Sequence, residues 1–163
     1  MTRQEATEFY RNHSKAVYNT ALRIVRNPAE AEEIMQDTFM KYFTKGLPGL
    51  SEASKSAWLR TTCIRMAIDC LRHRKRGLDL FVDRMPEEME EELEIPEGFD
   101  IVRIRNAMEG LPHPYALILD LILIEGMDYA GIAKLTGQKE VTLRSWYSRG
   151  RKRLIKELKA QTI

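Results

Sequence analysis

The sequence predicts an all-α protein made of two small helical domains joined by an acidic linker. Apolar residues recur at helical spacing along most of the 163 residues, whereas the alternation typical of strands is hard to find. Glycine and proline are sparse, with 9 and 6 residues. Charge is segregated along the chain, so that two basic segments flank an acidic one.

Bulk composition limits the class of protein. A hydrophobic fraction of 44% suffices for packed cores. The chain opens on the polar stretch MTRQEATEFY, and its longest apolar run, Ala116–Ile124, is interrupted by Asp120. That run is far shorter than the roughly 20 residues of a membrane helix. We therefore expect a cytoplasmic protein without membrane insertion.

The sequence lacks the patterns of catalytic and metal sites. The histidines His13, His73 and His113 are scattered, and it contains no glycine-rich phosphate loop. Cys63 and Cys70 lie seven residues apart on one predicted helix, and His73 alone does not complete a metal site. We expect two reduced core thiols, no cofactor, no metal and no enzymatic activity.

Segregated charge separates the two domains. Residues 55–76 carry seven cations and one acid, residues 77–101 carry ten acids and one cation, and residues 134–159 carry nine cations and two acids. Like charges at the density of the middle segment disfavour compact packing. We therefore expect an acidic linker over residues 78–98.

The first domain is expected over residues 1–77, as three helices. The first helix runs from about Arg3 to Asn27. Asn27 and Pro28 then predict a new start, with Asn27 as N-cap and Pro28 at the first helical position. The predicted core positions of the first two helices are Phe9, Val17, Ala21, Ile24, Ala31, Ile34, Met35, Thr38 and Tyr42.

The third helix, expected from Ser54 or Lys55 to Arg76, has two different faces. Its apolar stripe consists of Leu59, Cys63, Met66 and Cys70. The opposite face consists of Trp58, Thr62, Arg65, Asp69, Arg72 and Arg76. A ring for stacking and arginines for phosphates are what proteins use to hold single-stranded nucleic acid. A solvated face with a half-buried tryptophan explains the same residues equally well.

The second domain is expected over residues 99–163 and contains the pattern of a helix-turn-helix. Helical periodicity covers Phe99–Leu111 and Tyr115–Glu125, and Asp128 then caps the short helix DYAGIAKLTG. The small-residue, turn and aliphatic positions of the motif are Ala133, Gly137 and Leu143.

The helix after that turn, EVTLRSWYSRGRKRL, is basic and amphipathic. Its predicted core positions are Leu143, Tyr147, Gly150, Leu154 and Leu158. The other side offers arginine for guanine edges, and serine and lysine for phosphate oxygens, which are the contacts of a recognition helix in the major groove. We therefore predict DNA contacts from Thr142, Arg144, Ser145, Ser148, Arg149, Arg151 and Lys152.

Taken together, these segments resemble a bacterial RNA polymerase sigma factor of the extracytoplasmic-function (ECF) type. That family keeps only the second and fourth conserved regions, joined by a variable linker. In the first domain the resemblance rests on VYNTALRIVRNPAEAEEIMQDTFMKYF and WLRTTCIRMAIDCLRHRKR. In the second it rests on NAMEGLP, EGMDYAGIAKLTG and TLRSWYSRGRKRL. It covers nearly the whole chain.

The resemblance implies that the partners are core RNA polymerase and promoter DNA. In this family the helix matching Ala29–Phe43 docks on the β′ clamp helices, through the positions of Glu33, Gln36, Asp37 and Phe39. In this family the helix that matches the one starting at Trp58, with the loop before it (Gly46–Ser56), contacts the minus-ten element, where the DNA is melted and a flipped base is held. The helix matching Thr142–Leu158 contacts the minus-thirty-five element, and its domain also touches the β flap. An anti-sigma factor is a further candidate partner.

Four positions depart from the family pattern. The family usually has asparagine where Arg65 stands, and glycine, arginine and leucine where Val141, Trp146 and Tyr147 stand. Because of these departures, the resemblance carries over the role but not the promoter sequence. Trp146 is expected either to pack against DNA or to shield the core.

Two other functions explain part of the sequence. A stand-alone helix-turn-helix regulator would bind duplex DNA through the second domain alone, which leaves the helix with QDTF unexplained. A helical adaptor would bind an acidic protein through its basic faces and would show no preference for DNA.

Overall fold

The computed structural model describes the ranges 1–46, 49–74, 98 and 100–160, and all regular structure within them is helical. The all-α prediction is therefore confirmed for these residues. Within the same ranges, no helix combines the length and the apolarity that crossing a bilayer requires.

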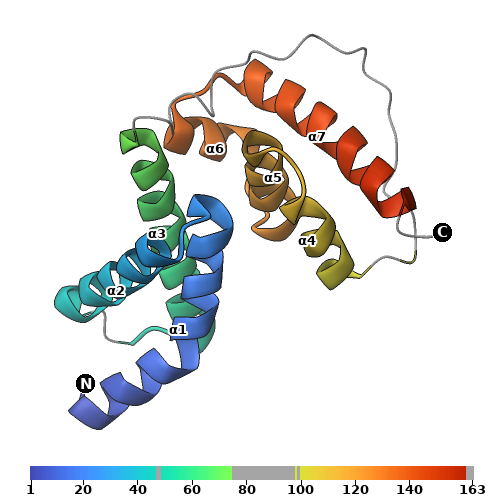
Figure 1. Ribbon diagram of the computed structural model, residues 1–163. Helices are drawn as coiled ribbons and strands as arrows, with labels where there is room; N and C mark the ends of the chain where they lie inside the picture. Colours follow the sequence, from blue (N-terminus) through green and yellow to red (C-terminus); the bar gives the residue numbers. More distant parts are fainter. Residues whose placement is uncertain (47–48, 75–97, 99, 161–163) are drawn as a thin grey trace. The chain divides into compact units, whose positions relative to one another are not determined.

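Contacts between Cα atoms divide the chain into two compact units, Met1–Arg74 and Lys75–Ile163, and each is described by itself (Figure 1). The predicted acidic linker, 78–98, lies outside the described residues apart from Gly98. The predicted domain limits stay a prediction.

The first unit is a bundle of α1 (Arg3–Val25), α2 (Pro28–Lys45) and α3 (Glu52–His73). The predicted start of α2 is confirmed: the Asn27 side chain accepts a hydrogen bond from the Glu30 N–H at 3.0 Å. α3 begins earlier than expected because the Ser51 hydroxyl caps it, accepting from the Ser54 N–H at 3.2 Å.

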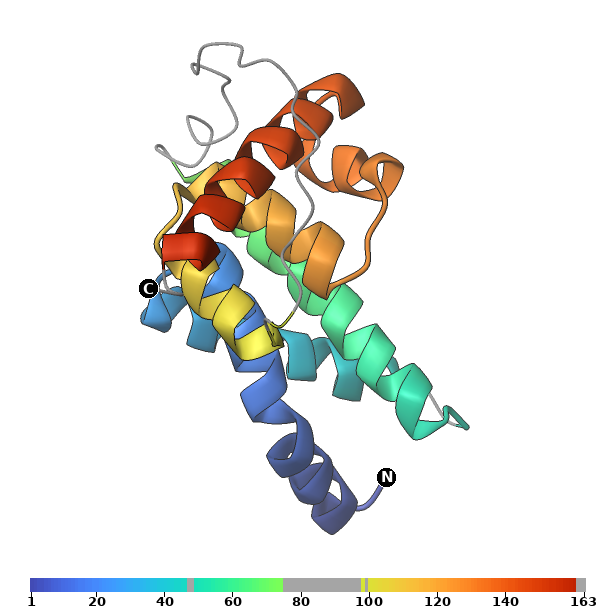
Figure 2. The same ribbon diagram turned by 90° about the vertical axis from the view of Figure 1, so that its right-hand side faces the viewer.

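The core of the first unit lies where the three helices meet. All nine core positions predicted for α1 and α2 are buried. On α3, Leu59 and Cys63 are buried, whereas Met66 and Cys70 are half-buried at the edge of the contact. α3 lies alongside α1, as the two views in Figures 1 and 2 agree. The apolar stripe of α3 is thus displaced slightly from the predicted one.

Neither cysteine forms a disulfide within the described residues, and of the two expected core thiols Cys63 is buried whereas Cys70 is half-buried. The Cys63 thiol is buried and donates to the Val17 carbonyl at 3.4 Å, and the Cys70 thiol lies 3.5 Å from a Glu30 carboxylate oxygen. Burial, and then the charge of Glu33, raise the pKa of the Cys70 thiol. A raised pKa lowers the thiolate fraction of Cys70.

The second unit contains a π-helical segment that the sequence did not predict. Its elements are α4 (Ile101–Glu109), α5 (His113–Leu119), the π-helix η2 (Asp120–Ile124), α6 (Tyr129–Thr136) and α7 (Glu140–Ala160). The expected single helix over Tyr115–Glu125 changes character at Asp120, whose carbonyl accepts from the Glu125 N–H at 3.0 Å. This wider hydrogen-bonded ring defines a π-turn.

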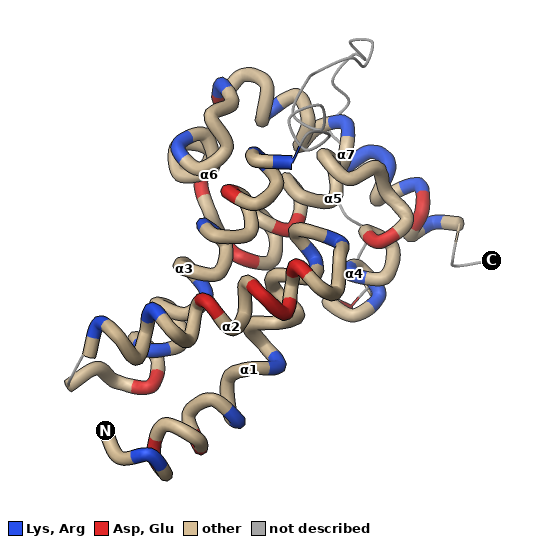
Figure 3. Tube along the Cα trace, turned by 60° about the vertical axis from the view of Figure 1, so that its left-hand side comes forward, with Lys and Arg blue, Asp and Glu red and all other residues tan. Residues whose placement is uncertain are grey.

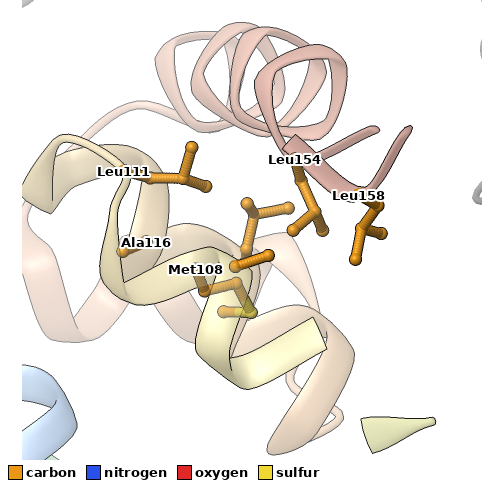
Figure 4. Close-up of a cluster of buried hydrophobic side chains, with 7 residues drawn as sticks. Met108, Leu111, Ala116, Leu154 and Leu158 are labelled. Carbon is orange, nitrogen blue, oxygen red and sulfur yellow. The ribbon is translucent and has the colours of Figure 1, made fainter. Parts of the chain in front are cut away.

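Apolar side chains from α4, α5 and α7 form one cluster in the second unit (Figure 4). The cluster consists of Ala107, Met108, Leu111, Ala116, Leu119, Leu154 and Leu158. α7 lies close to α5 at Gly150, where an added Cβ would lie 3.1 Å from the Tyr115 Cβ. The glycine therefore permits a tight contact between the two helices. This packing fixes which side of α7 faces outward.

Candidate nucleic-acid interface and partner-docking surface

α6 and α7 form the predicted helix-turn-helix. The Asp128 carboxylate caps α6, accepting from the Gly131 N–H at 2.7 Å. Gly137 ends α6 with a φ of 75°, a left-handed conformation that glycine adopts without strain. Ile132 and Leu143 are buried on the two sides of the turn. The turn therefore holds α7 at a fixed angle to α6.

The core side of α7 agrees with the sequence prediction. Leu143, Gly150, Leu154 and Leu158 are buried, and Tyr147 is half-buried against the apolar cluster. Trp146 is also buried, which agrees with the expectation that it shields the core. The predicted DNA-contacting residues are therefore left on the other sides of the helix.

Those seven residues differ in exposure. Arg144 is exposed, and the half-buried ones are Thr142, Ser145, Ser148, Arg151 and Lys152. Arg149 is placed differently from the expectation, because only 6% of its surface is exposed. Its guanidinium would have to be uncovered before it could touch DNA. Arg149 therefore does not belong to the exposed surface of α7.

Two tyrosines border the exposed surface of α7. The Cζ of Arg144 lies 4.6 Å from the ring centroid of Tyr129, the first residue of α6. The ring of Tyr129 meets that of Tyr147 edge to face, with centroids 6.2 Å apart. Burial raises the pKa of Tyr129, with a smaller contribution from Tyr147 and an opposing one from Arg144. The phenol therefore stays neutral at physiological pH.

The polar face of α3 is open over most of its length. Arg65, Asp69 and Arg72 are exposed, and Thr62 is half-buried. The remaining arginine of the predicted set, Arg76, lies outside the described residues.

The tryptophan of that face is anchored by α2. Trp58 is half-buried, and its ring packs edge to face against Tyr42, with centroids 5.5 Å apart. The Lys45 ammonium group lies 5.9 Å from the centroid of the indole. The Trp58 ring is thus partly buried against α2 and partly exposed, which is compatible with both interpretations of this face: a stacking surface and a solvated face with a half-buried tryptophan.

The outward face of α2 carries three of the four residues predicted to contact polymerase. Glu33, Gln36 and Asp37 are exposed, and Figure 3 shows the acidic residues of α2 in red. Phe39 is placed differently from the expectation, because it is only 2% exposed. Its ring lies 5.9 Å from that of Phe9 and so belongs to the core of the bundle.

An apolar extension of this face was not predicted from the sequence. Met40 is 65% exposed, and Phe43 and Tyr10 are exposed as well. Met40 follows Gln36 by four residues and Asp37 by three, so helical spacing alone could have placed it beside them. We call the exposed set Glu33, Gln36, Asp37, Met40 and Phe43 the α2 face.

One ion pair ties the end of α3 to the start of α2. Arg74 donates from Nε to a Glu30 carboxylate oxygen at 3.2 Å, and its terminal nitrogen also contacts that carboxylate. Arg74 is the C-cap residue of α3 and the last residue of the first unit. The pair therefore fixes where the chain leaves the bundle.

The fold and these surfaces define a class: a two-domain helical protein whose second domain carries a helix-turn-helix of the kind that binds DNA. Residues 9–77 match the family described as sigma-70 region 2, and residues 101–154 match sigma-70 region 4. The chain therefore belongs to the sigma-70 family of RNA polymerase sigma factors, and it is of the ECF type.

Several curated sigma factors are similar to this chain. The ECF RNA polymerase sigma factor SigE of Mycolicibacterium smegmatis is 29% identical over 152 residues, which cover 90% of this chain and 59% of that protein. The probable RNA polymerase sigma factor RfaY of Xanthomonas campestris is 32% identical over 148 residues, which cover 85% and 36%. The chain thus spans less than two thirds of the length of each of these two relatives.

Bacillus subtilis RNA polymerase sigma factor SigV is 24% identical, over 82% of this chain and 79% of its own length. Among solved structures, the sigma factor RpoE in complex with the anti-sigma factor NepR from Bartonella quintana has a TM-score of 0.52 and 24% identity. That match covers 96% of this chain and 98% of the other. At this identity it shows the fold alone.

Proposed function

We propose that this chain binds core RNA polymerase and directs it to specific promoters, where it supports DNA melting and the start of transcription. The observation that carries the proposal is the succession of a region 2 domain and a region 4 domain along one chain. Each domain has an exposed polar surface on a helix whose opposite side is packed into a core.

The α2 face is the proposed docking site for the β′ clamp helices. Its acids suit a basic partner, because complementary charge steers association and fixes register. Its exposed Met40 and Phe43 can supply the apolar contacts that dominate interface energies. Phe39 would contribute by holding α2 in the bundle rather than by direct contact.

The polar face of α3 is the proposed site for the melted minus-ten element. Flipping a base out of a duplex costs a few kcal/mol. Stacking on an aromatic ring contributes roughly 1–3 kcal/mol per base, which can offset that cost. Trp58 would offer the ring, and Arg65 and Arg72 would hold phosphates.

The exposed side of α7 is the proposed site for the minus-thirty-five element, with Arg144 and Arg151 as the base-contacting arginines. The second unit would also touch the β flap, and an anti-sigma factor is a further candidate partner.

Because polymerase and promoter DNA are cytoplasmic in bacteria, we propose that the protein acts in the cytoplasm.

Transcription with purified components tests the proposal. The chain plus core polymerase should start transcription at defined sites in a library of genomic fragments, whereas neither component alone should. Asp37→Arg should abolish these starts by reversing a charge on the α2 face. Glu157→Arg, which reverses an exposed acid on α7, is the matched control and should leave polymerase binding intact.

Each competing function gives a different result. Tight binding of one promoter duplex by the chain alone, with no effect on transcription, would support a stand-alone regulator. An absence of any DNA preference, with and without polymerase, would support an adaptor that binds an acidic protein.

A further inference from the structure

Arg144 and Tyr129 come from the two helices of the helix-turn-helix and meet at its outer edge. The guanidinium carbon lies 4.6 Å from the centroid of the tyrosine ring, within the range of a cation–π contact. Arg144 is nevertheless exposed to solvent. The contact therefore places the guanidinium against the ring, and the side chain stays open to a ligand.

Stacking of this kind does not compete with hydrogen bonding. A guanidinium group is planar, and its five N–H donors lie in that plane. A ring beneath the plane leaves the donors free to form two parallel bonds with the O6 and N7 atoms of guanine. A stacked arginine can therefore be held still and still donate to a base.

The tyrosine ring is supported by its own helix and by a second ring. Tyr129 is the first residue of α6, next to the Asp128 cap. Its ring meets Tyr147 edge to face, and Tyr147 packs against the apolar cluster of the second unit. The position of the ring is therefore tied to the core rather than to a mobile surface.

We propose that Tyr129 is a positioning residue for base recognition, and that its ring holds the Arg144 guanidinium in the orientation that pairs with a guanine edge. The inference deepens the proposed function, on which it rests, by adding a residue that determines specificity without contacting DNA. Ordering a long side chain costs entropy, so an arginine held in advance loses less on binding.

A stacked arginine elsewhere on α7 provides the control. The Cζ of Arg153 lies 5.1 Å from the ring centroid of Tyr115. Arg153 is exposed but is not among the residues predicted to contact DNA. Arg153→Ala should therefore leave base preference unchanged, whereas Arg144→Ala should relax it at one position of the site.

The first measurement needs neither polymerase nor DNA. The aromatic ring should shift the Arg144 side-chain proton resonances upfield in the NMR spectrum of the full chain. Tyr129→Phe should keep the shift and Tyr129→Leu should abolish it. Random-coil positions for these protons in the unmodified chain would overturn the proposal.

The second measurement uses a duplex selected from a randomised library by the full chain bound to core polymerase. Tyr129→Leu should weaken binding about two- to fivefold, the size of an exposed cation–π contact, and relax the same base position as Arg144→Ala. In the Arg144→Ala background, Tyr129→Leu should not weaken duplex binding any further. Tyr129→Phe should behave like the original chain.

The outcomes separate this inference from the proposed function. If the library yields no preferred duplex, the proposed function fails, and base recognition by Arg144 fails with it. If a duplex is found but Tyr129→Leu weakens binding equally with and without Arg144, Tyr129 has a merely structural role and the inference is wrong.

Discussion

The two basic helices, α3 and α7, use aromatic rings in opposite ways. On α3 the ring belongs to the surface itself, because Trp58 is half-buried and braced by Tyr42 and Lys45 of α2. On α7 the arginines form the exposed surface. The tyrosine rings near Arg144 and Arg153 come from other helices.

This difference indicates which form of DNA each surface is suited to bind. A ring held in place offers a flat face, and any unpaired base can stack on it. A guanidinium held in place offers a fixed set of donors, and only a matching base edge can accept from them. The first arrangement suits a melted strand, and the second suits an intact duplex.

Leu154→Ala should have the largest effect and should disable the α7 surface alone. Leu154 is fully buried in the cluster with Met108 and Ala116. Its truncation should cost about 2–5 kcal/mol of the free energy of unfolding of the second unit. In a Trp58→Phe background, Trp146 is the single remaining tryptophan and reports this transition in urea.

Leu59→Ala is the matched truncation in the first unit. It removes a buried leucine of α3, so it should disable polymerase docking while duplex binding through α7 persists. If either truncation unfolds both units together, the two surfaces do not belong to separately stable domains and the comparison fails.

Trp58→Ala should have the next largest effect, because it removes a surface on which a base can stack. We expect single-stranded minus-ten DNA to bind the factor–polymerase complex more weakly by about 1–3 kcal/mol, the value of one stacked base. Fluorescence anisotropy with a labelled oligonucleotide measures this. Trp58→Phe should keep part of the affinity, and duplex binding through α7 should not change. An equal loss on both DNA forms would contradict the assignment.

Val141→Gly should have a smaller effect, confined to the duplex. Val141 is 77% exposed on α7, three residues before Arg144, and an exposed branched side chain there can contact a thymine methyl group. Losing that contact should cost about 1 kcal/mol. The thymines of the selected duplex are replaced by deoxyuridine one at a time. One of these replacements should weaken binding by the original chain, and none should weaken binding by Val141→Gly. Equal sensitivity of both proteins would exclude the contact.

The smallest expected effect is on the pH dependence of the stability of the first unit. Glu52 accepts from the Lys55 ammonium at 3.1 Å and lies 3.7 Å from the His13 Nε2, and these groups hold the pKa of Glu52 below its ordinary value. A lowered folded-state pKa contributes stability that is present at neutral pH and lost as pH falls through it.

The contribution should be small because Glu52 is exposed to solvent. In a Trp146→Phe background, where Trp58 is the single tryptophan, unfolding should be less sensitive to acid with Glu52→Gln than without it, and the second unit should not respond. An identical pH profile for both proteins would show that the pair contributes nothing.

Much of the fold could be predicted from local pattern. The N-cap at Asn27, the glycine turn at Gly137 and the buried faces of α1 and α2 are short-range features that periodicity and capping chemistry express directly. The π-turn at Asp120 could not be predicted, because apolar spacing does not distinguish it from a continuous α-helix.

The candidate sites could be predicted only in part. The family resemblance supplied Glu33, Gln36, Asp37 and Phe39 together, and Phe39 is the one of the four that is buried. Helical spacing on α7 included Arg149, whose exposure depends on what packs over its side of the helix.

The sequence by itself determined that this chain is helical, that it has two basic surfaces, and which family it resembles, because those properties follow from composition and spacing along the chain. Only the tertiary structure decided that Met40 is open, that Arg149 is covered and that Tyr129 lies beneath Arg144. The physical reason is that exposure and stacking depend on side chains brought together from different helices, and their distances are set by packing rather than by sequence separation.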